Sequence, residues 1–134
     1  RQVALRCLEA ASRCPNSENA VVLSWCGGQL GASVAAMSCG LYVDDSELFD
    51  AARDLCAHIL AGAVAVPRPL SSSGLCHGAF GIAHLLWRAG KLCGEPGYAR
   101  MGDAWMAQGL AQRAPGEGVR GYFWTSGDRA ARIA

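Results

Sequence analysis

The chain repeats itself at a spacing of fifty residues. When the sequence is displaced by that amount, the identical pairs that align include Cys26 with Cys76, Gly28 with Gly78, Gly31 with Gly81 and Gly40 with Gly90. Each copy has a loop, a Gly-containing turn, an apolar helix, a short polar turn and an amphipathic helix. A period of this size is typical of stacked helical hairpins, which bury their apolar faces only against their neighbours. The repeat predicts an all-α fold of hairpin repeats, at about 24–62 and 74–113.

Helical periodicity and capping signals place two helices in each copy. The expected ranges are about 30–39 and 47–60 in the first copy, and about 79–89 and 98–112 in the second. For the second helix of the first copy, Asp44 and Glu47 form a capping-box-like start, and Gly62 supplies an end. Pro96 suits the start of the last helix. Apolar residues at helical spacing also predict a helix over 1–14.

Composition and charge restrict the class of protein. The 134 residues are 51% hydrophobic and 17% charged, which favours one modest domain of closely packed helices. The net charge of +1 and the lack of a dense basic face predict no nucleic-acid partner. The longest apolar run, 59–66, is too short to cross a bilayer, so no transmembrane segment is expected. Both ends stop within open-ended patterns, which indicates that 1–134 is a single partial domain from a longer protein.

The chain has seven cysteines. An odd number without a secretory signal favours a reducing compartment, and hence a cytoplasmic protein, over a disulfide scaffold. Most of them are expected to be small buried apolar side chains. Cys56 fits this expectation because it shares the apolar side of a helix with Leu48, Ala52 and Ile59. The same interpretation applies to Cys7, Cys14, Cys39 and Cys93.

Cys26, Cys76 and His77 form a different pattern. The two Cys hold equivalent positions in neighbouring hairpins, so their side chains can converge at one end of the array, and His77 is adjacent. Thiolate and imidazole are preferred zinc ligands, and three protein ligands with one open position is the catalytic arrangement. The residues alone leave two interpretations open, a three-ligand zinc site and ordinary core residues.

Glycines follow the ligand candidates in both copies. A Gly at a helix start costs about 1 kcal/mol relative to Ala. The recurrence of Gly28, Gly31, Gly78 and Gly81 therefore predicts unusual backbone dihedrals there, or the close approach of another helix.

Two stretches resemble the hallmark motifs of the lanthionine synthetase C-like family. They are WCGGQLG from Trp25 and LCHGAFG from Leu75, which are similar to the family's Trp-Cys-x-Gly and Cys-His-Gly loops in order and separation. The resemblance covers about 24–112 and implies the C-terminal part of an α/α toroid, which has an inner and an outer ring of helices. It also implies that Cys26, Cys76 and His77 hold Zn²⁺, with a fourth position open to a substrate thiol.

The resemblance implies the function of a lanthionine synthetase, a cyclase of lanthipeptide biosynthesis. A zinc-activated Cys thiolate of a precursor peptide would add to dehydroalanine or dehydrobutyrine and close a thioether ring. A dehydratase domain or protein is a further implied partner. Two alternatives stay open: a non-catalytic zinc-binding helical module that binds a peptide, and a relative that adds glutathione to dehydroamino acids.

The catalytic groups depart from the family pattern. Val22 stands where the family has an Arg, and the family's earlier His-Gly and Asp motifs are not found in this sequence. The catalytic residues are therefore unassigned. His84 is a candidate proton donor, with a packing role as the alternative, and His58 is expected on a partly exposed helix face. Trp25 is expected to pack beside the site.

Two further segments carry expectations. The segment 71–74, SSSG, is typical of a flexible loop. Near the C-terminus, Tyr122, Phe123 and Trp124 either line a peptide groove or bury an otherwise loose tail.

Overall fold

The structure is a computed structural model, and it describes residues 6, 23–26, 28–62, 72–117, 119–122, 124–126 and 129–131. Of the helix expected over 1–14, only Arg6 is described, and it is helical. The expectations for Cys7, Cys14, Val22 and Phe123 lie outside the described residues.

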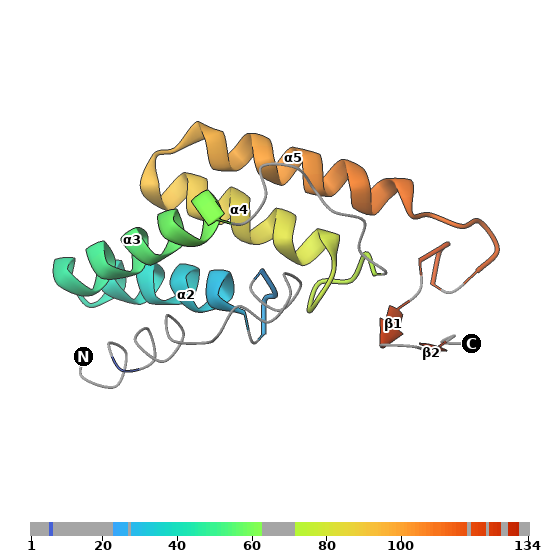
Figure 1. Ribbon diagram of the computed structural model, residues 1–134, viewed down its shortest axis with the longest axis horizontal. Coiled ribbons are helices and arrows are strands. Elements are labelled where there is room, and N and C mark those ends of the chain that lie inside the picture. Colours follow the sequence, from blue (N-terminus) through green and yellow to red (C-terminus); the bar gives the residue numbers. More distant parts are fainter. Residues whose placement is uncertain are drawn as a thin grey trace.

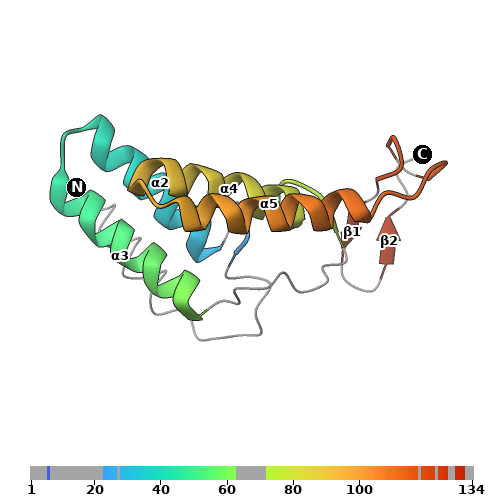
Figure 2. The same cartoon turned by 90° about the horizontal axis from the view of Figure 1, so that it is seen from above.

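Two antiparallel helical hairpins make up the body of the protein (Figure 1). The first joins α2 (Gln29–Tyr42) to α3 (Ser46–Gly62), and the second joins α4 (Ala79–Cys93) to α5 (Pro96–Ala111). The hairpins meet through α2 and α4, while α3 and α5 pack against their own partners. In Figure 2, α4 and α5 run side by side and α3 runs at an angle to α2. The predicted all-α fold of hairpin repeats, as in a segment of an α/α toroid, is confirmed.

The core lies between the apolar faces of these helices. On α3, the buried side chains Leu48, Ala52, Cys56 and Ile59 recur at helical spacing, as the sequence predicts. They meet Leu30 and Met37 of α2 and the α4 residues Ile82, Leu85 and Leu86 in one cluster. Full burial of a Leu or Ile side chain is worth about 1.5–3 kcal/mol, so this cluster supplies the main stabilisation of the two hairpins.

Glycines in α5 make room for aromatic side chains of α4. A Cβ on Gly102 would lie 2.6 Å from Cδ1 of Trp87, and a Cβ on Gly109 would overlap the ring of Phe80. The indole Nε1 of Trp87 also donates a hydrogen bond to Asp103 Oδ1 at 2.9 Å. The second hairpin is therefore held by ring-to-backbone packing as well as by aliphatic contacts.

The fifty-residue repeat is preserved at the tips of the hairpins. The N–H of Asp45 donates to the carbonyl of Gly40 at 2.8 Å, and the N–H of Glu95 donates to the carbonyl of Gly90 at 3.0 Å. The residues before them, Asp44 and Gly94, both have positive φ, at 54° and 70°. The two turns therefore share one backbone conformation, although only the second has Gly at the left-handed position.

Some local predictions need correction. α3 ends at Gly62, as expected, and α5 begins at Pro96, two residues ahead of the expected range. The residue that caps α3 is Asp45 rather than Asp44, because Asp45 Oδ1 accepts the N–H of Leu48 at 3.1 Å. Asp44 is instead the left-handed residue of the turn.

Two of the cysteines expected in the core do not lie fully inside it. Cys39 is exposed, and Cys93 is only half-buried, with its Sγ 3.5 Å from Sδ of Met37. Cys39 follows Met37 by two residues, which is about 200° around a helix, so burial of Met37 turns Cys39 outward.

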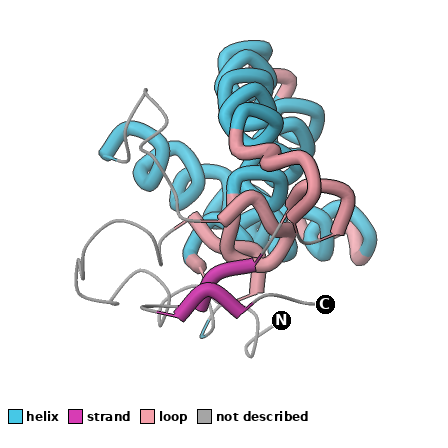
Figure 3. The backbone as a smooth tube through the Cα atoms, turned by 90° about the vertical axis from the view of Figure 1, so that its right-hand side faces the viewer, coloured by secondary structure: helices cyan, strands magenta, loops and turns pink. Residues whose placement is uncertain are grey.

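The C-terminal segment forms a short two-stranded ribbon that the sequence did not predict. β1 (Trp124–Ser126) pairs antiparallel with β2 (Arg129–Ala131), and the two strands are magenta in Figure 3. In this pairing Thr125 lies opposite Ala130. Ahead of it, the ring of Tyr122 packs edge-on against Phe80, with ring centroids 5.5 Å apart. This contact joins Tyr122, which is half-buried, to α4, whereas the side chains of Phe123 and Trp124 lie outside the described residues.

Candidate metal centre

The candidate site is built on the two loops that enter α2 and α4. In the second loop, the N–H groups of Ala79 and Phe80 donate to the carbonyls of Ser72 and Ser73, both at 3.2 Å. These bonds satisfy N–H groups at the start of α4, where the N-cap residue Gly78 has no side chain to do so. Ser72 and Ser73 are buried. The described part of the segment expected to be a flexible loop, 72–74, is therefore a hydrogen-bonded cap on α4.

Two repeat-related glycines let each loop lie against its own helix. A Cβ on Gly31 would overlap the carbonyl oxygen of Trp25, and a Cβ on Gly81 would overlap that of Leu75. The predicted close approach therefore exists, but it is made by the preceding loop and not by another helix. Gly28 and Gly78 have extended backbones, with φ of −89° and −122°, so the unusual dihedrals expected there are not found.

A backbone hydrogen bond joins the two loops beside the site. The N–H of Trp25 donates to the carbonyl oxygen of Cys76 at 3.0 Å. Each loop is thus held by its own helix through a glycine and by the other loop through this bond. The positions of Cys26 and Cys76 relative to each other follow from both constraints.

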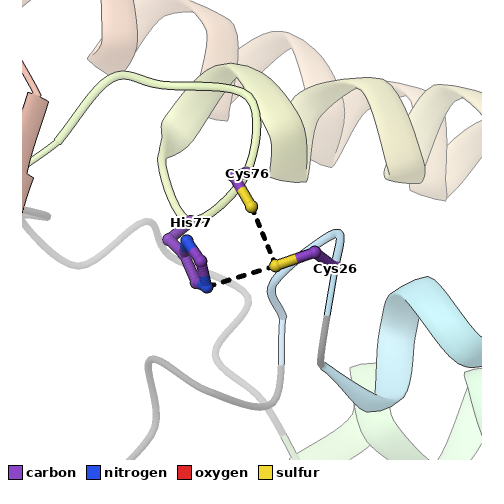
Figure 4. Close-up of side chains that lie close together, drawn as sticks. All are labelled: Cys26, Cys76 and His77. Carbon is purple, nitrogen blue, oxygen red and sulfur yellow. Dashed lines mark hydrogen bonds between the residues drawn. The ribbon is translucent and has the colours of Figure 1, made fainter.

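The side chains of Cys26, Cys76 and His77 converge in front of these loops (Figure 4). Cys76 Sγ donates to Cys26 Sγ at 2.8 Å, and Cys26 Sγ lies 3.3 Å from His77 Nε2. The three potential ligand atoms all lie within 4.8 Å of one another, and all three residues are exposed. Within the described ranges, this is the one group of three or more His, Cys, Asp or Glu residues that converges in this way.

The donor set fits a metal ion, and Zn²⁺ in particular. Two thiols and an imidazole are its preferred ligands, and three protein ligands leave a fourth tetrahedral position for water or substrate. With Zn–S bonds of about 2.3 Å, a tetrahedral site separates two sulfur atoms by about 3.8 Å. The observed separation is 2.8 Å, so the two thiols need only move apart by about 1 Å to reach that geometry.

The protonation state of the two thiols also affects metal binding. The hydrogen bond to Cys26, together with partial desolvation and the neighbouring thiol's charge, raises the pKa of Cys76 above its ordinary value. A cation at the site reverses this effect, because a coordinating thiol is deprotonated outright.

The other residues singled out by sequence lie outside this cluster. His84 is exposed on α4 and His58 is exposed on α3, the latter on a helix face as expected. Trp25 was expected to pack beside the site, but 56% of its surface is exposed. Leu75, its counterpart in the repeat, is 66% exposed and was not singled out from the sequence. The repeat itself was the signal for it, since both residues immediately precede a cluster Cys.

Among the described helices, none combines the length and the apolar character needed to cross a membrane.

Comparison with known proteins gives one result for the chain. The family model described as lanthionine synthetase C-like protein matches residues 8–114. This range includes both hairpins and all three residues of the cluster. Searches for similar curated proteins and for similar solved structures gave no match.

Proposed function

Because the chain belongs to the lanthionine synthetase C-like family, we propose that it is the zinc-binding segment of a lanthionine synthetase. In this proposal Cys26, Cys76 and His77 hold Zn²⁺. The observation that carries it is the convergence of their three ligand atoms within 4.8 Å, from two loops fifty residues apart. Such convergence of a Cys₂His set is the arrangement of a catalytic zinc site with one open position.

The proposed reaction is the addition of a peptide Cys thiol to a dehydroamino acid. Bound Zn²⁺ supplies one element of it, by lowering the pKa of the substrate thiol so that a thiolate is available near neutral pH. The sulfur atom then bonds to the β-carbon of dehydroalanine or dehydrobutyrine, and the α-carbon takes up a proton. The product is a thioether ring with the same mass as the linear peptide.

The chain's own residues contribute an accessible reaction site. All three cluster residues are exposed, so a peptide can reach them without opening the hairpins. Trp25 and Leu75, which precede the two Cys, present apolar surface of the kind that apolar peptide side chains contact. The proton donor for the α-carbon stays unassigned. His84 remains a candidate, since it is exposed on the helix that begins next to the site.

The proposal implies specific partners and a location. The precursor peptide is the substrate, and its dehydroamino acids come from a dehydratase domain or protein that removes water from Ser or Thr. Because the substrate thiol and both Cys must stay reduced, the proposed location is the cytoplasm.

The first experiment measures zinc by elemental mass spectrometry on the purified chain and on Cys26→Ala and Cys76→Ala. We expect one zinc per chain in the parent and its loss in both variants. Cys39→Ala is the matched control, because Cys39 is an exposed thiol outside the cluster, and it should keep its zinc. Well-folded parent protein without zinc would overturn the proposal.

A second experiment separates catalysis from binding. The zinc-loaded chain is incubated with a synthetic peptide that contains one Cys and one dehydroalanine, with and without glutathione. Loss of the peptide thiol at constant mass indicates cyclisation, and a mass gain of one glutathione indicates the glutathione-adding alternative. Zinc binding with neither product above the uncatalysed rate would identify a non-catalytic zinc module and overturn the assignment as an active cyclase segment.

A further inference from the structure

The two cluster cysteines are placed to react with each other. Cys26 Sγ and Cys76 Sγ lie 2.8 Å apart, which is about 0.75 Å longer than a disulfide bond. Both thiols are free and exposed. In Figure 4 the two side chains point toward one another from separate loops. A small approach of the two sulfur atoms would therefore bring them to bonding distance.

The backbone on both sides is already held in place for this bond. The 3.0 Å hydrogen bond from the N–H of Trp25 to the carbonyl of Cys76 joins the two loops next to the sulfur atoms. Gly31 and Gly81 allow each loop to pack closely against the helix that follows it, because a side chain at either position would overlap the loop. The conformational entropy of bringing the two chain segments together is therefore lost when the protein folds. Formation of the disulfide does not have to overcome this cost again.

The other described cysteines are arranged differently. Cys56 is fully buried, which keeps oxidants away from its sulfur atom. Cys39 is exposed on α2 and lies outside the cluster. Cys93 is half-buried, with Met37 Sδ 3.5 Å from its Sγ. An exposed thiol with a second exposed thiol beside it is found at Cys26 and Cys76.

We propose that Cys26 and Cys76 form a reversible disulfide when the site carries no metal, and that this bond controls metal binding. The oxidant is a small disulfide such as glutathione disulfide. The thiolate of one Cys attacks it, forms a mixed disulfide and releases one glutathione thiolate. The second Cys attacks the mixed disulfide and releases the other glutathione. The two protein thiols are oxidised, and one glutathione disulfide is reduced to two glutathione molecules.

The effect on metal binding rests on the proposed function, whereas formation of the bond does not. The disulfide removes two of the three ligand atoms at once and leaves only the imidazole of His77. A metal needs both sulfur atoms as thiolates. Metal and disulfide therefore exclude each other, and a bound metal protects the thiols from oxidation.

The test uses the full chain, reduced and stripped of metal with a chelator, then incubated with glutathione disulfide with or without prior Zn²⁺. Intact mass and tandem mass spectrometry of linked peptides identify the products. We expect the metal-free chain to lose two hydrogen atoms, about 2 Da, with a link between Cys26 and Cys76. Dithiothreitol should reverse the change. Prior Zn²⁺ should prevent the link, and the linked chain should take up no Zn²⁺.

Two variants sharpen this experiment. Cys76→Ser should leave Cys26 as a stable mixed disulfide with glutathione, since no other thiol among the described residues lies beside Cys26 to displace it. Cys39→Ser should still form the link. Separate glutathione adducts on Cys26 and Cys76 in the parent, or a link that includes Cys39 instead, would overturn the proposal.

The outcomes also separate this proposal from the proposed function. Zinc binding without any Cys26–Cys76 link would overturn the disulfide and leave the zinc site standing. A link in a chain that never binds Zn²⁺ would overturn the zinc site, and with it the control of metal binding, but would support the bond itself.

Discussion

The backbone N–H of Trp25 donates a 3.0 Å hydrogen bond to the carbonyl oxygen of Cys76, so each hairpin repeat contributes one atom to the bond that joins the two loops of the candidate metal centre. Each loop alone carries too few ligands for a metal, one Cys in the first and one Cys with one His in the second. The centre therefore depends on the contact between the two repeats. Substitutions that move either loop should weaken metal binding.

Gly81→Ala should disturb the centre without touching a ligand. The added Cβ would overlap the carbonyl oxygen of Leu75, so the loop that carries Cys76 and His77 must move. We expect zinc affinity to fall about 10–100-fold, as for other changes that misplace ligands. The free energy of unfolding should fall by about 1–3 kcal/mol. Chelator competition and urea denaturation measure the two effects.

The matched control for this change is Gly97→Ala. The nearest atom to its added Cβ, Arg100 Nη2, is 3.8 Å away, so the side chain fits. Zinc affinity should equal that of the parent, and stability should change by no more than about 1 kcal/mol. Equal zinc affinities for the two variants would contradict the role assigned to Gly81.

His77→Ala and His84→Ala should separate a ligand from a neighbouring histidine. Both residues are exposed, but only His77 has its ring nitrogen within the cluster. We expect His77→Ala to lose zinc and His84→Ala to retain it, as measured by elemental mass spectrometry. If His84 donates a proton during cyclisation, its variant should show a lower kcat with unchanged zinc content. Zinc loss in His84→Ala would show that the cluster is larger than these three residues.

Cys56 should make stability depend on pH in the alkaline range. Burial raises the pKa of its thiol from 9.0 to about 12. Below about pH 9 the thiol is protonated in both the folded and the unfolded chain, so it adds no pH dependence. Above that pH only the unfolded chain releases the proton, and stability is lost until the folded pKa is passed. The loss reaches at most about 1.4 kcal/mol per pH unit.

This effect is measured by urea denaturation of the metal-free chain between about pH 8 and pH 11, in the parent and in Cys56→Ala. The variant should be less stable at every pH because of the lost packing, yet its stability should fall less steeply above about pH 9. Some slope should persist, since burial also raises the pKa of Cys93 and of Tyr98. Parallel curves for the two proteins would show that Cys56 ionises equally in both states.

Asp45→Ala should weaken the start of α3. Asp45 Oδ1 accepts the N–H of Leu48 at 3.1 Å, and loss of such a cap costs about 1 kcal/mol. The repeat supplies the control, because Glu95 holds the same position before α5 but makes no side-chain cap hydrogen bond. Glu95→Ala should therefore change the free energy of unfolding by less than about 0.5 kcal/mol. Equal losses in urea denaturation would mean that the Asp45 hydrogen bond adds nothing.

Several features of this fold could be found from residue order alone. The fifty-residue repeat predicted two hairpins, and helical spacing placed Leu48, Ala52 and Cys56 on one buried face. These features are local, since the period of an amphipathic helix depends only on which residues follow one another. Cys39 was expected in the core, and its outward position follows from helix geometry only once Met37 is known to be buried, because residues two apart lie on opposite sides of a helix.

Other features depended on which segments meet. Three examples are the capping of α4 by Ser72 and Ser73, the packing of each loop against its glycine, and the pairing of β1 with β2. In each case no local sequence pattern specifies which groups pair. A serine in a loop has the same sequence signature whether its carbonyl faces water or a helix N-terminus.

The sequence by itself determined the helices, their apolar faces and the identity of the donor groups Cys26, Cys76 and His77. Only the tertiary structure decided that these groups lie within 4.8 Å of one another. The physical reason is that ligand atoms bound to one ion at about 2.0–2.3 Å must lie within about 4 Å of one another. Such positions come from the packing of α2 against α4 and from the hydrogen bond between the two loops, and neither is encoded in the spacing of the residues.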